Sequence, residues 1–308
     1  MDSPRSGVFA ALATPIDSRG RPDEPAFVRA VEFVLERGID GVVIGGGTAE
    51  YPHFTIEERS ALISLAVRRM RGERPVIASI GTSSIHSTVQ LARCAADSGA
   101  DVLLIPMPHF FRYEQEDLIS FCEAVCGAVT IPCWLYNLPS FTAGVTVESA
   151  IQLLHGVPNL VGMKDSSGDR SHLQPLAQAR ADGEYAVFVG DDSLLFDALS
   201  AGWNGVVSGI ACFAPELIRA VFDAYKSGDV ALARRCQDLL DEVIEQIVKL
   251  PIPWGVRIGL AARGVANGPM HVPPSARRAK QTEELGAWLA AWAEKRGMDL
   301  RDVWKNLD

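Results

Sequence analysis

Lys164 is the residue whose position most directly suggests chemistry. It ends the apolar run at 160–164, and it is the only lysine in the first 225 residues of a chain with 23 arginines and six lysines. Burial of an ammonium group is costly unless the group is paired or loses its proton. A desolvated lysine amine can attack a carbonyl and form a Schiff base, whereas an arginine guanidinium stays protonated. The alternative is a lysine that reaches the rim of the fold or pairs with Asp165.

Tyr136 is the second candidate. It lies in the run Trp134-Leu135-Tyr136-Asn137, which precedes the Lys164 run along the chain. If the two runs are neighbouring strands, the phenol stands beside the amine and can transfer protons. A strand tyrosine taken alone is more often a core residue whose hydroxyl bonds at the edge of the fold.

Three glycines followed by Thr48 form a segment that can approach a ligand closely. Such a segment offers backbone N–H groups and one hydroxyl, which suit a carboxylate or a phosphate. It lacks the Lys-Ser/Thr ending of a P-loop and the spacing of a dinucleotide-binding turn. Glycine runs also form tight turns, so the signal is weak by itself.

Other kinds of catalytic centre have little support. The six histidines form no HxH or HExxH pair, so we expect no metal ion and no other cofactor, and we keep only His109 as a residue of a site rim. Ser167 and Ser208 have no His and Asp at a recognisable spacing, which argues against a serine nucleophile.

Composition narrows the class of protein. The chain has 308 residues, 48% of them apolar and 22% charged, which is typical of a soluble protein with a large core. Its net charge of -9 argues against binding to nucleic acid or to an anionic membrane. No apolar run is long enough to span a bilayer, the amino terminus lacks a signal-peptide pattern, and the six cysteines are scattered as reduced thiols are. We therefore expect a cytoplasmic protein.

Eight short β-branched runs alternate with amphipathic stretches. The predicted strands are Val8–Ala13, Gly41–Gly46, Val76–Ile80, Val102–Met107, Cys133–Asn137, Leu160–Lys164, Ala186–Val189 and Gly205–Ser208. The helices predicted between the first of them are Glu24–Arg37, Thr55–Arg71, Ser84–Ser98 and Gln115–Gly127. Turns with a C-cap glycine recur just before strands, at Gly38-Ile39-Asp40, Gly99-Ala100-Asp101 and Gly202-Trp203-Asn204.

This alternation predicts an α/β fold, a (β/α)8 TIM barrel with a C-terminal helical extension. A doubly wound sheet would usually carry a glycine-rich turn after its first strand, where this chain has Ala13-Thr14-Pro15-Ile16. We expect residues 1–225 to form the barrel. Residues 226–308, with helices near 230–250, 254–263 and 281–295, should pack on it.

The active site of a TIM barrel lies at the C-terminal ends of the strands. The candidate site residues in or just after the C-terminal ends of the predicted strands are Gly47, Thr48, Phe110, Tyr136, Lys164, Gly190, Asp191, Asp192 and Ser208.

These strand-end motifs resemble those of the dihydrodipicolinate synthase/N-acetylneuraminate lyase family, pyruvate-type class I aldolases built on a (β/α)8 barrel. The matches, in chain order, are Thr14-Pro15, Gly46-Gly47-Thr48-Ala49-Glu50 for the family's GTTGE, Tyr136-Asn137-Leu138-Pro139 for YNxP, residues 162–168 for GxKxxxG and Gly190-Asp191-Asp192 for GxD. The resemblance implies that Lys164 forms the Schiff base, that Tyr136 transfers protons, and that Gly47 with Thr48 holds a substrate carboxylate. It also implies a homo-oligomer, a tetramer or a dimer.

Two departures from the family pattern bear on the substrate. The synthases carry an arginine after YNxPS that holds the acid group of the second substrate, and this chain has Phe141 there. Two positions that supply relay hydroxyls in the synthases are Gly47 and Phe110 here. These departures argue against the synthase reaction. The run Lys164-Asp165-Ser166-Ser167-Gly168-Asp169 resembles that of family members which cleave a 2-oxo-3-deoxy sugar acid or a 4-hydroxy-2-oxo acid to pyruvate and an aldehyde, or catalyse the reverse condensation.

Under this hypothesis Asp191, Asp192 and Ser208 bind the aldehyde half, and Phe110 and Gly190 also contact the substrate. The alternative for the two aspartates is a cap for a helix that begins close after them. Three alternatives for the function stay open. They are a dehydratase that uses the same Schiff base, a 4-hydroxy-tetrahydrodipicolinate synthase, which Phe141 disfavours, and a non-catalytic member that binds 2-oxo acids.

Overall fold

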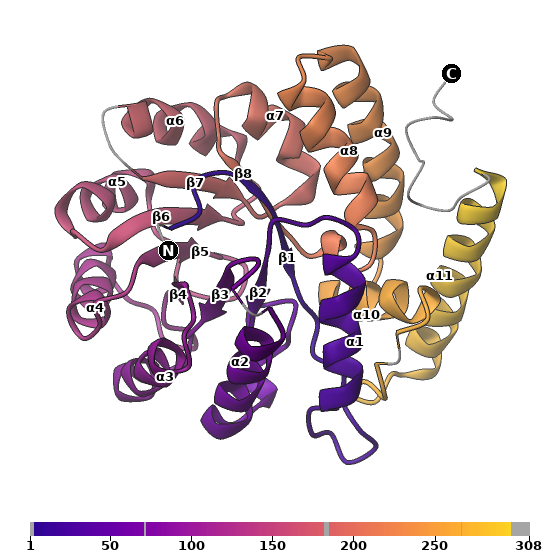
Figure 1. Ribbon diagram of the computed structural model, residues 1–308, viewed down its shortest axis with the longest axis horizontal. Helices are drawn as coiled ribbons and strands as arrows, with labels where there is room; N and C mark the ends of the chain where they lie inside the picture. Colours follow the sequence, from indigo (N-terminus) through magenta and orange to yellow (C-terminus); the bar gives the residue numbers. More distant parts are fainter. Residues whose placement is uncertain (1–2, 71, 182–184, 266, 297–308) are drawn as a thin grey trace.

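The computed structural model describes residues 3–70, 72–181, 185–265 and 267–296. Within these residues, eight parallel strands form a closed barrel in which each strand pairs with the next and β8 pairs with β1 (Figure 1). The strands are β1 (Gly7–Ala11), β2 (Gly41–Ile44), β3 (Val76–Ser79), β4 (Val102–Pro106), β5 (Cys133–Asn137), β6 (Leu160–Asp165), β7 (Ala186–Val189) and β8 (Gly205–Ser208). The predicted (β/α)8 barrel is confirmed.

An α-helix follows each strand and lies on the outside of the barrel (Figure 1). These helices are α1 (Glu24–Leu35), α2 (Ile56–Met70), α3 (Ile85–Asp97), α4 (Gln115–Gly127), α5 (Val147–Gly156), α6 (Leu173–Ala181), α7 (Leu195–Ser200) and α8 (Pro215–Lys226). Short 3-10 helices lie in the loops after β2, β6, β7 and β8, namely η1 (Tyr51–His53), η2 (Arg170–His172), η3 (Asp192–Leu194) and η4 (Ile210–Cys212).

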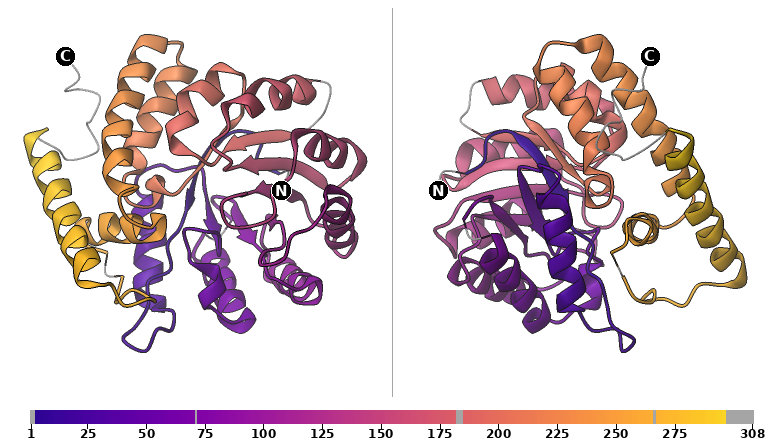
Figure 2. Two further views of the ribbon diagram at one scale, coloured as in Figure 1. Left: turned by 180° about the vertical axis from the view of Figure 1, so that it is seen from behind. Right: turned by 45° about the vertical axis from the view of Figure 1, so that its right-hand side comes forward.

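The C-terminal extension contains α9 (Val230–Ile247), α10 (Ile252–Ala262) and α11 (Ala276–Lys295). Figure 2 shows α9 beside α8 and α11 at the outer edge of the molecule. Helix α11 begins before the predicted residue 281 because the Ser275 side chain caps it by accepting a hydrogen bond from the Arg278 N–H. Residues 297–308 of the predicted extension and the predicted helix end at Arg71 lie outside the described residues. The domain boundary near residue 225 stays a prediction.

Two strands end two residues before their predicted ends, and three others differ from the prediction by one residue at that end. The first strand ends at Ala11 instead of Ala13, and the second at Ile44 instead of Gly46. After Ile44 the backbone turns through Gly45, whose φ of 73° lies in the left-handed region, and this turn takes the following glycines out of the sheet. The glycine run therefore forms a loop at the mouth of the barrel.

The recurring glycine turns tie neighbouring strands together. Their glycines all have positive φ, as predicted for helix C-caps. The polar residue two positions later accepts a hydrogen bond from a backbone N–H of the preceding strand: Asp40 from Val8 at 2.7 Å, Asp101 from Val76 at 2.8 Å and Asn204 from Val187 at 2.9 Å. These bonds fix the register at the N-terminal side of the barrel.

Aromatic side chains fill the interior of the barrel. Trp134 stacks on Phe188 with ring centroids 4.4 Å apart, and the Phe9 ring meets both rings edge-on. Trp134 lies two residues before Tyr136 and therefore faces the same interior side of β5. Gly162 makes room for it, because a Cβ there would lie 2.6 Å from Trp134 Cδ1. This packing leaves the C-terminal mouth of the barrel for polar side chains.

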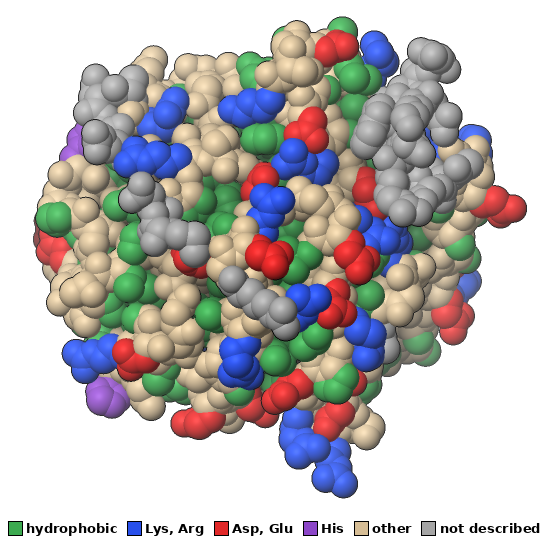
Figure 3. Space-filling view, viewed as in Figure 1, with side chains coloured by type: hydrophobic (Ala, Val, Ile, Leu, Met, Phe, Trp, Pro, Cys, Tyr) green, Lys and Arg blue, Asp and Glu red, His purple; other side chains and the backbone are tan. Residues whose placement is uncertain are grey.

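On the face of the molecule shown in Figure 3, basic and acidic side chains of the described residues are interspersed. Within the described part of the chain, no helix combines the length and the apolar character needed to cross a membrane.

We predict that Gly162→Ala lowers the free energy of unfolding by about 1–3 kcal/mol, because the added methyl would overlap the indole of Trp134. Urea denaturation followed by circular dichroism measures the change. The matched control is Gly127→Ala at the end of α4, where an added Cβ meets nothing within 4 Å. The control should lose no stability. Equal stability of wild type and Gly162→Ala would contradict the packing described for the barrel interior.

Candidate active site

Lys164 and Tyr136 lie opposite one another on neighbouring strands. Their Cα atoms are register partners in the β5–β6 pair, near the C-terminal end of each strand. Lys164 Nζ donates a hydrogen bond of 3.1 Å to the Tyr136 hydroxyl and lies 4.3 Å from the centroid of its ring. The two residues are 5% and 3% exposed. The structure therefore brings together the amine and the phenol that the sequence singles out.

Gly190, at the end of β7, lies directly against the lysine. A Cβ built on Gly190 would be 2.5 Å from Lys164 Cε and would overlap Ser166 Oγ, so a larger residue would displace the amine. The Ser166 hydroxyl is buried and has no hydrogen-bond partner among the described residues. Ser166 is not among the site residues predicted from the sequence, although the two-residue period of a strand places it on the same side as Lys164.

The glycine run lies at the same mouth. A Cβ at Gly47 would be 3.7 Å from both the Tyr136 hydroxyl and Leu138 Cδ2. Thr48 Oγ1 lies 3.2 Å from the position of a Cβ on Gly209, which follows β8. The loop therefore extends from the phenol to the end of β8. Binding of a carboxylate by this loop stays a prediction.

Asp191 has the structural role that the capping alternative describes. Its carboxylate accepts hydrogen bonds from the Ser193 N–H at 3.1 Å and the Ser193 hydroxyl at 2.7 Å, and so caps η3. Asp191 Oδ2 also lies 3.0 Å from the position of a Cβ on Gly168, in the loop after β6. This contact places Asp191 between the loops of β6 and β7.

Asp192 has a different environment. Its Oδ1 is buried without a hydrogen-bond partner among the described residues, while Oδ2 accepts a long bond of 3.4 Å from the Ile210 N–H. Burial raises the pKa of Asp192 to about 6, although the Ser208 hydroxyl, the Ile210 N–H and the charge of Lys164 each act to lower it. The Asp192 carboxyl, whose pKa lies near neutral pH, therefore interacts electrostatically with Lys164, the candidate nucleophile. Ser208 Oγ also accepts a hydrogen bond from the Ala211 N–H at 2.8 Å.

The two phenylalanines at the rim face solvent. Phe110 is 88% exposed, has a φ of 82° and packs its ring edge-on against Phe111 at 5.0 Å. Phe141, in the turn after β5, is 63% exposed. The structure does not bring Phe110 to Lys164, and a substrate contact of Phe110 stays a prediction.

A polar cluster behind the lysine fixes the end of β6. Asp165 Oδ1 accepts a hydrogen bond of 2.9 Å from Asn137 Nδ2, and Asp165 Oδ2 lies 2.9 Å from both Ser167 Oγ and His172 Nδ1. The hydrogen bond with Asp165 raises the pKa of His172. Asp165 is thus paired within this cluster, and no ion pair with Lys164 occurs among the described residues.

Ser167, His172 and Asp165 meet in space, which their spacing in the sequence does not predict. Ser167 Oγ at 3.2 Å and Asp165 Oδ2 at 2.9 Å both contact the same ring nitrogen, Nδ1. A serine nucleophile requires the imidazole between the hydroxyl and the carboxylate, with one ring nitrogen for each. The geometry of these three side chains therefore fits a structural hydrogen-bond cluster and not a catalytic triad.

His109 lies at the rim, as expected. Its Nδ1 is 3.3 Å from the Tyr51 hydroxyl, and the guanidinium of Arg59 lies 4.9 Å from the centroid of the Tyr51 ring. Arg59 donates hydrogen bonds to the carbonyls of Ser79 and Gly81. Burial and the charge of Arg59 lower the pKa of His109, which keeps the imidazole neutral at neutral pH.

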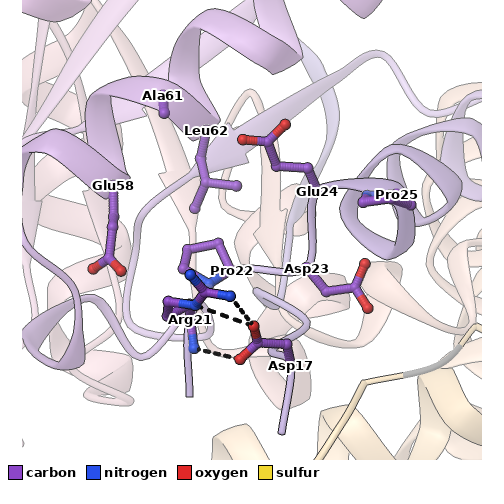
Figure 4. Close-up of a pocket in the computed structure, with 9 residues that line it drawn as sticks. All are labelled: Asp17, Arg21, Pro22, Asp23, Glu24, Pro25, Glu58, Ala61 and Leu62. Atoms are coloured by element: carbon purple, nitrogen blue, oxygen red, sulfur yellow. Dashed lines mark hydrogen bonds and ion pairs between the residues drawn. The ribbon is translucent and has the colours of Figure 1, made fainter. Parts of the chain in front are cut away.

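A separate surface pocket lies between the loop after β1 and helix α2 (Figure 4). Three of its four acidic side chains, those of Asp17, Asp23 and Glu58, have structural partners. Asp17 pairs with Arg21 at 2.9 Å, Asp23 caps α1, and Glu58 accepts a hydrogen bond from the Thr55 N–H. None of the lining residues belongs to the strands that carry Lys164 and Tyr136.

A (β/α)8 barrel that buries a lysine amine against a phenol at its C-terminal mouth has the architecture of a Schiff-base aldolase. The chain matches the family model described as the Dihydrodipicolinate synthetase family over residues 4–291. It belongs to this family, and it is a lyase of the class I aldolase type. The resemblance noted in the sequence is confirmed.

Several relatives cover most of the chain. The 4-hydroxy-tetrahydrodipicolinate synthase of Bacillus subtilis (strain 168) is 30% identical over 267 residues, which are 86% of this chain and 92% of that protein. The protein of the same name from Exiguobacterium sibiricum is 35% identical over 268 residues, 87% of this chain and 91% of its own length.

Solved structures share the architecture. The 4-hydroxy-tetrahydrodipicolinate synthase of Methylacidiphilum fumariolicum SolV superposes with a TM-score of 0.88 at 26% identity, covering 97% of this chain and 99% of its own. YagE, a prophage protein of E. coli K12 solved in complex with pyruvate, gives a TM-score of 0.86 at 25% identity over 93% of this chain and 98% of its own.

The raised pKa of Asp192 generates a prediction about stability. Because this pKa lies near 6, well above the 3.8 of an ordinary aspartate, the folded protein binds more protons than the unfolded chain between the two values. The contribution of Asp192 to the free energy of unfolding therefore falls as the pH rises through this window. We predict that Asp192→Asn raises the free energy of unfolding at neutral pH by about 1–2 kcal/mol and flattens its pH dependence below that.

Denaturation at a series of pH values measures this effect. The matched control is the neighbouring Asp191→Asn, which alters a cap without relieving a buried charge and should be neutral or slightly destabilising. A less stable Asp192→Asn at neutral pH would contradict a net cost of burying the charged Asp192 carboxyl.

Proposed function

We propose that this chain forms a Schiff base between Lys164 and C2 of a 2-oxo acid, and cleaves the acid to pyruvate and an aldehyde or catalyses the reverse condensation. The observation that carries the proposal is the 3.1 Å hydrogen bond from Lys164 Nζ to the Tyr136 hydroxyl in a buried mouth. Burial of an amine beside a phenol costs stability, which a chemical role for the amine explains and which binding of a 2-oxo acid alone does not require. This favours an enzyme over a non-catalytic binding protein.

The geometry supports the following sequence of steps. The amine form of Lys164 attacks C2, Tyr136 gives its phenolic proton to the hydroxyl of the carbinolamine, and water leaves to give an iminium. The Tyr136 phenolate then removes the proton of the C4 hydroxyl, the C3–C4 bond breaks, and the iminium accepts its electron pair as an enamine. The aldehyde departs, C3 takes the proton back from Tyr136, and water hydrolyses the new iminium to pyruvate and the free amine. The substrate carboxylate lies against the Gly47 and Thr48 backbone, beside the phenol.

A 2-oxo-3-deoxy sugar acid or a 4-hydroxy-2-oxo acid is the proposed substrate class. Support comes from the polar groups after β7 and β8, because Asp192 has a buried oxygen without a partner among the described residues and Ser208 lies beside it. A substrate hydroxyl would satisfy that oxygen. Phe141 stands where the resemblance implies an arginine for a second acid group, and a phenyl ring cannot hold a carboxylate.

Synthesis of 4-hydroxy-tetrahydrodipicolinate is the second candidate, since the curated relatives described above carry that name. The pyruvate complex of the E. coli relative supports pyruvate as the shared half of both reactions. A dehydratase would use the same iminium but expel the C4 hydroxyl as water. Product analysis separates the three, because they yield pyruvate with an aldehyde, a cyclic dicarboxylate or a longer oxo acid.

We also propose that the protein is cytoplasmic. All the cysteines are free thiols, and most are buried, which suits a reducing compartment such as the cytoplasm. We also expect a homo-oligomer, a tetramer or a dimer, which sedimentation velocity measures directly.

We predict that sodium borohydride added in the presence of pyruvate fixes a mass adduct on Lys164, located by peptide mass spectrometry. Lys164→Ala should form no adduct, and Lys226→Ala, at the end of α8, is the control that should behave as wild type. Tyr136→Phe should still form the adduct but turn over about a hundredfold more slowly, because the proton carrier is lost. Wild-type protein without an adduct on Lys164 would overturn the proposed function.

A panel of 2-oxo-3-deoxy sugar acids and 4-hydroxy-2-oxo acids, assayed for pyruvate release, then tests the substrate class. Release from at least one of them at a rate that Lys164→Ala abolishes is the expected result. Adduct formation without pyruvate release from any of them would shift the assignment to the synthase or the dehydratase.

A further inference from the structure

Arg257 is a buried charge in the helical extension that the proposed reaction does not use. It lies on α10 and is 1% exposed, and its Nη1 donates a hydrogen bond of 3.0 Å to Glu50 Oε2. Glu50 is itself 9% exposed and comes directly after the run that contains Gly47 and Thr48. A buried ion pair therefore joins the extension to the loop at the mouth of the barrel.

The backbone of Glu50 is held in an uncommon conformation. Its φ of 56° and ψ of 39° lie in the left-handed region, which is unfavourable for a residue with a Cβ. Two hydrogen bonds hold it there, because the Glu50 N–H donates to the Gly47 carbonyl at 3.0 Å and the carboxylate accepts from Arg257. Strain of this kind persists only where surrounding contacts enforce it. Arg257 provides one of those contacts from outside the loop.

Arg257 also binds two further segments. Its Nη2 donates hydrogen bonds to the carbonyls of Asn267 and Pro269, which follow α10. The Asn267 carbonyl in turn accepts a hydrogen bond of 3.1 Å from the Ile16 N–H, in the loop after β1. The guanidinium therefore lies at a junction of the loops after β1 and β2 with the extension.

A second contact between the extension and the same loop is independent of Arg257. The ring of His271 stacks on that of His53 in η1, with centroids 4.3 Å apart and planes inclined by 8°. Phe54 meets the His271 ring edge-on at 5.1 Å. The extension thus covers the segment that follows Glu50 as well as Glu50 itself.

We propose that Arg257 is a positioning residue for the carboxylate of the 2-oxo acid, because through Glu50 it holds Gly47 and Thr48 in the geometry that binds this group. The inference rests on the proposed function, in which that loop receives the substrate carboxylate. Without the guanidinium, Glu50 would be a buried unpaired carboxylate and would leave its position. The loop would then lose the constraint that keeps it next to the Tyr136 hydroxyl, and small displacements of binding groups weaken binding and slow turnover.

The experiment titrates pyruvate in the borohydride trapping reaction. Arg257→Met keeps an unbranched apolar stem and removes the guanidinium with its charge, and Arg257→Lys restores a charge without the planar fork of donors. The matched control is Arg263→Met, because Arg263 lies in the same extension and forms a partly buried ion pair of 2.8 Å with Glu216 of α8, away from the loop. Each variant is assayed well below its melting temperature.

The pyruvate concentration that gives half-maximal trapping should rise about tenfold in Arg257→Met, as expected for weakening one charge-assisted hydrogen bond, and less in Arg257→Lys. It should not change in Arg263→Met. Hydrogen exchange of the amides at 45–50 should accelerate in Arg257→Met alone. For the full reaction, KM should rise more than kcat falls.

Equal shifts in Arg257→Met and Arg263→Met, or no shift in Arg257→Met, would show that Arg257 only stabilises the fold and would overturn the inference. If Arg257→Met does not fold, Glu50→Gln tests the same link, and an unchanged titration in that variant has the same meaning. Absence of any adduct in wild type is a different result, because it overturns the proposed function and not the role of Arg257 alone.

Discussion

The parallel pairing of β5 with β6 sets Tyr136 directly opposite Lys164, and the rest of the site is built around that register. Closure of the barrel makes this pairing rigid, since each strand is held by two neighbours. The interior beneath is filled by the stacked rings of Trp134 and Phe188, so the amine and the phenol occupy the last layer before solvent. A hydrogen bond of 3.1 Å between two groups that are both about 95% buried follows from these restraints.

Lys164 and Tyr136 have open space on one side and a hydrogen-bonded cluster of polar side chains on the other. Gly190 keeps the space next to Lys164 Cε free, and Asp192 places a titratable carboxyl within its electrostatic field. Behind the strand, Asp165 binds Asn137 and His172, which ties the ends of β5 and β6 together. Adjacent residues of a strand point to opposite faces, so one short segment supplies both the nucleophile and the anchor that holds it.

The helical extension helps to hold the mouth of the barrel in place, because it carries Arg257, whose guanidinium pairs with Glu50. Buried ion pairs contribute little net stability compared with apolar packing, and they are most useful where geometry has to be specified. Glu50 has a left-handed backbone conformation next to the glycine loop. Local sequence preferences do not maintain this conformation in a residue with a Cβ. The ion pair between Arg257 and Glu50, which are 207 residues apart in the sequence, supplies the restraint that the loop lacks.

The sequence by itself determined the barrel, because eight β-branched runs separated by amphipathic stretches and glycine turns admit few other folds, and three of the strands begin and end where they are predicted. It also determined the lysine and the tyrosine, since an amine at the end of an apolar strand has few structural uses. Only the tertiary structure decided which polar residues surround them. His172 and Arg257 give no signal of their own, because hydrogen bonds and ion pairs between distant residues depend on register and side-chain direction, whereas hydrophobic periodicity depends only on near neighbours in the chain.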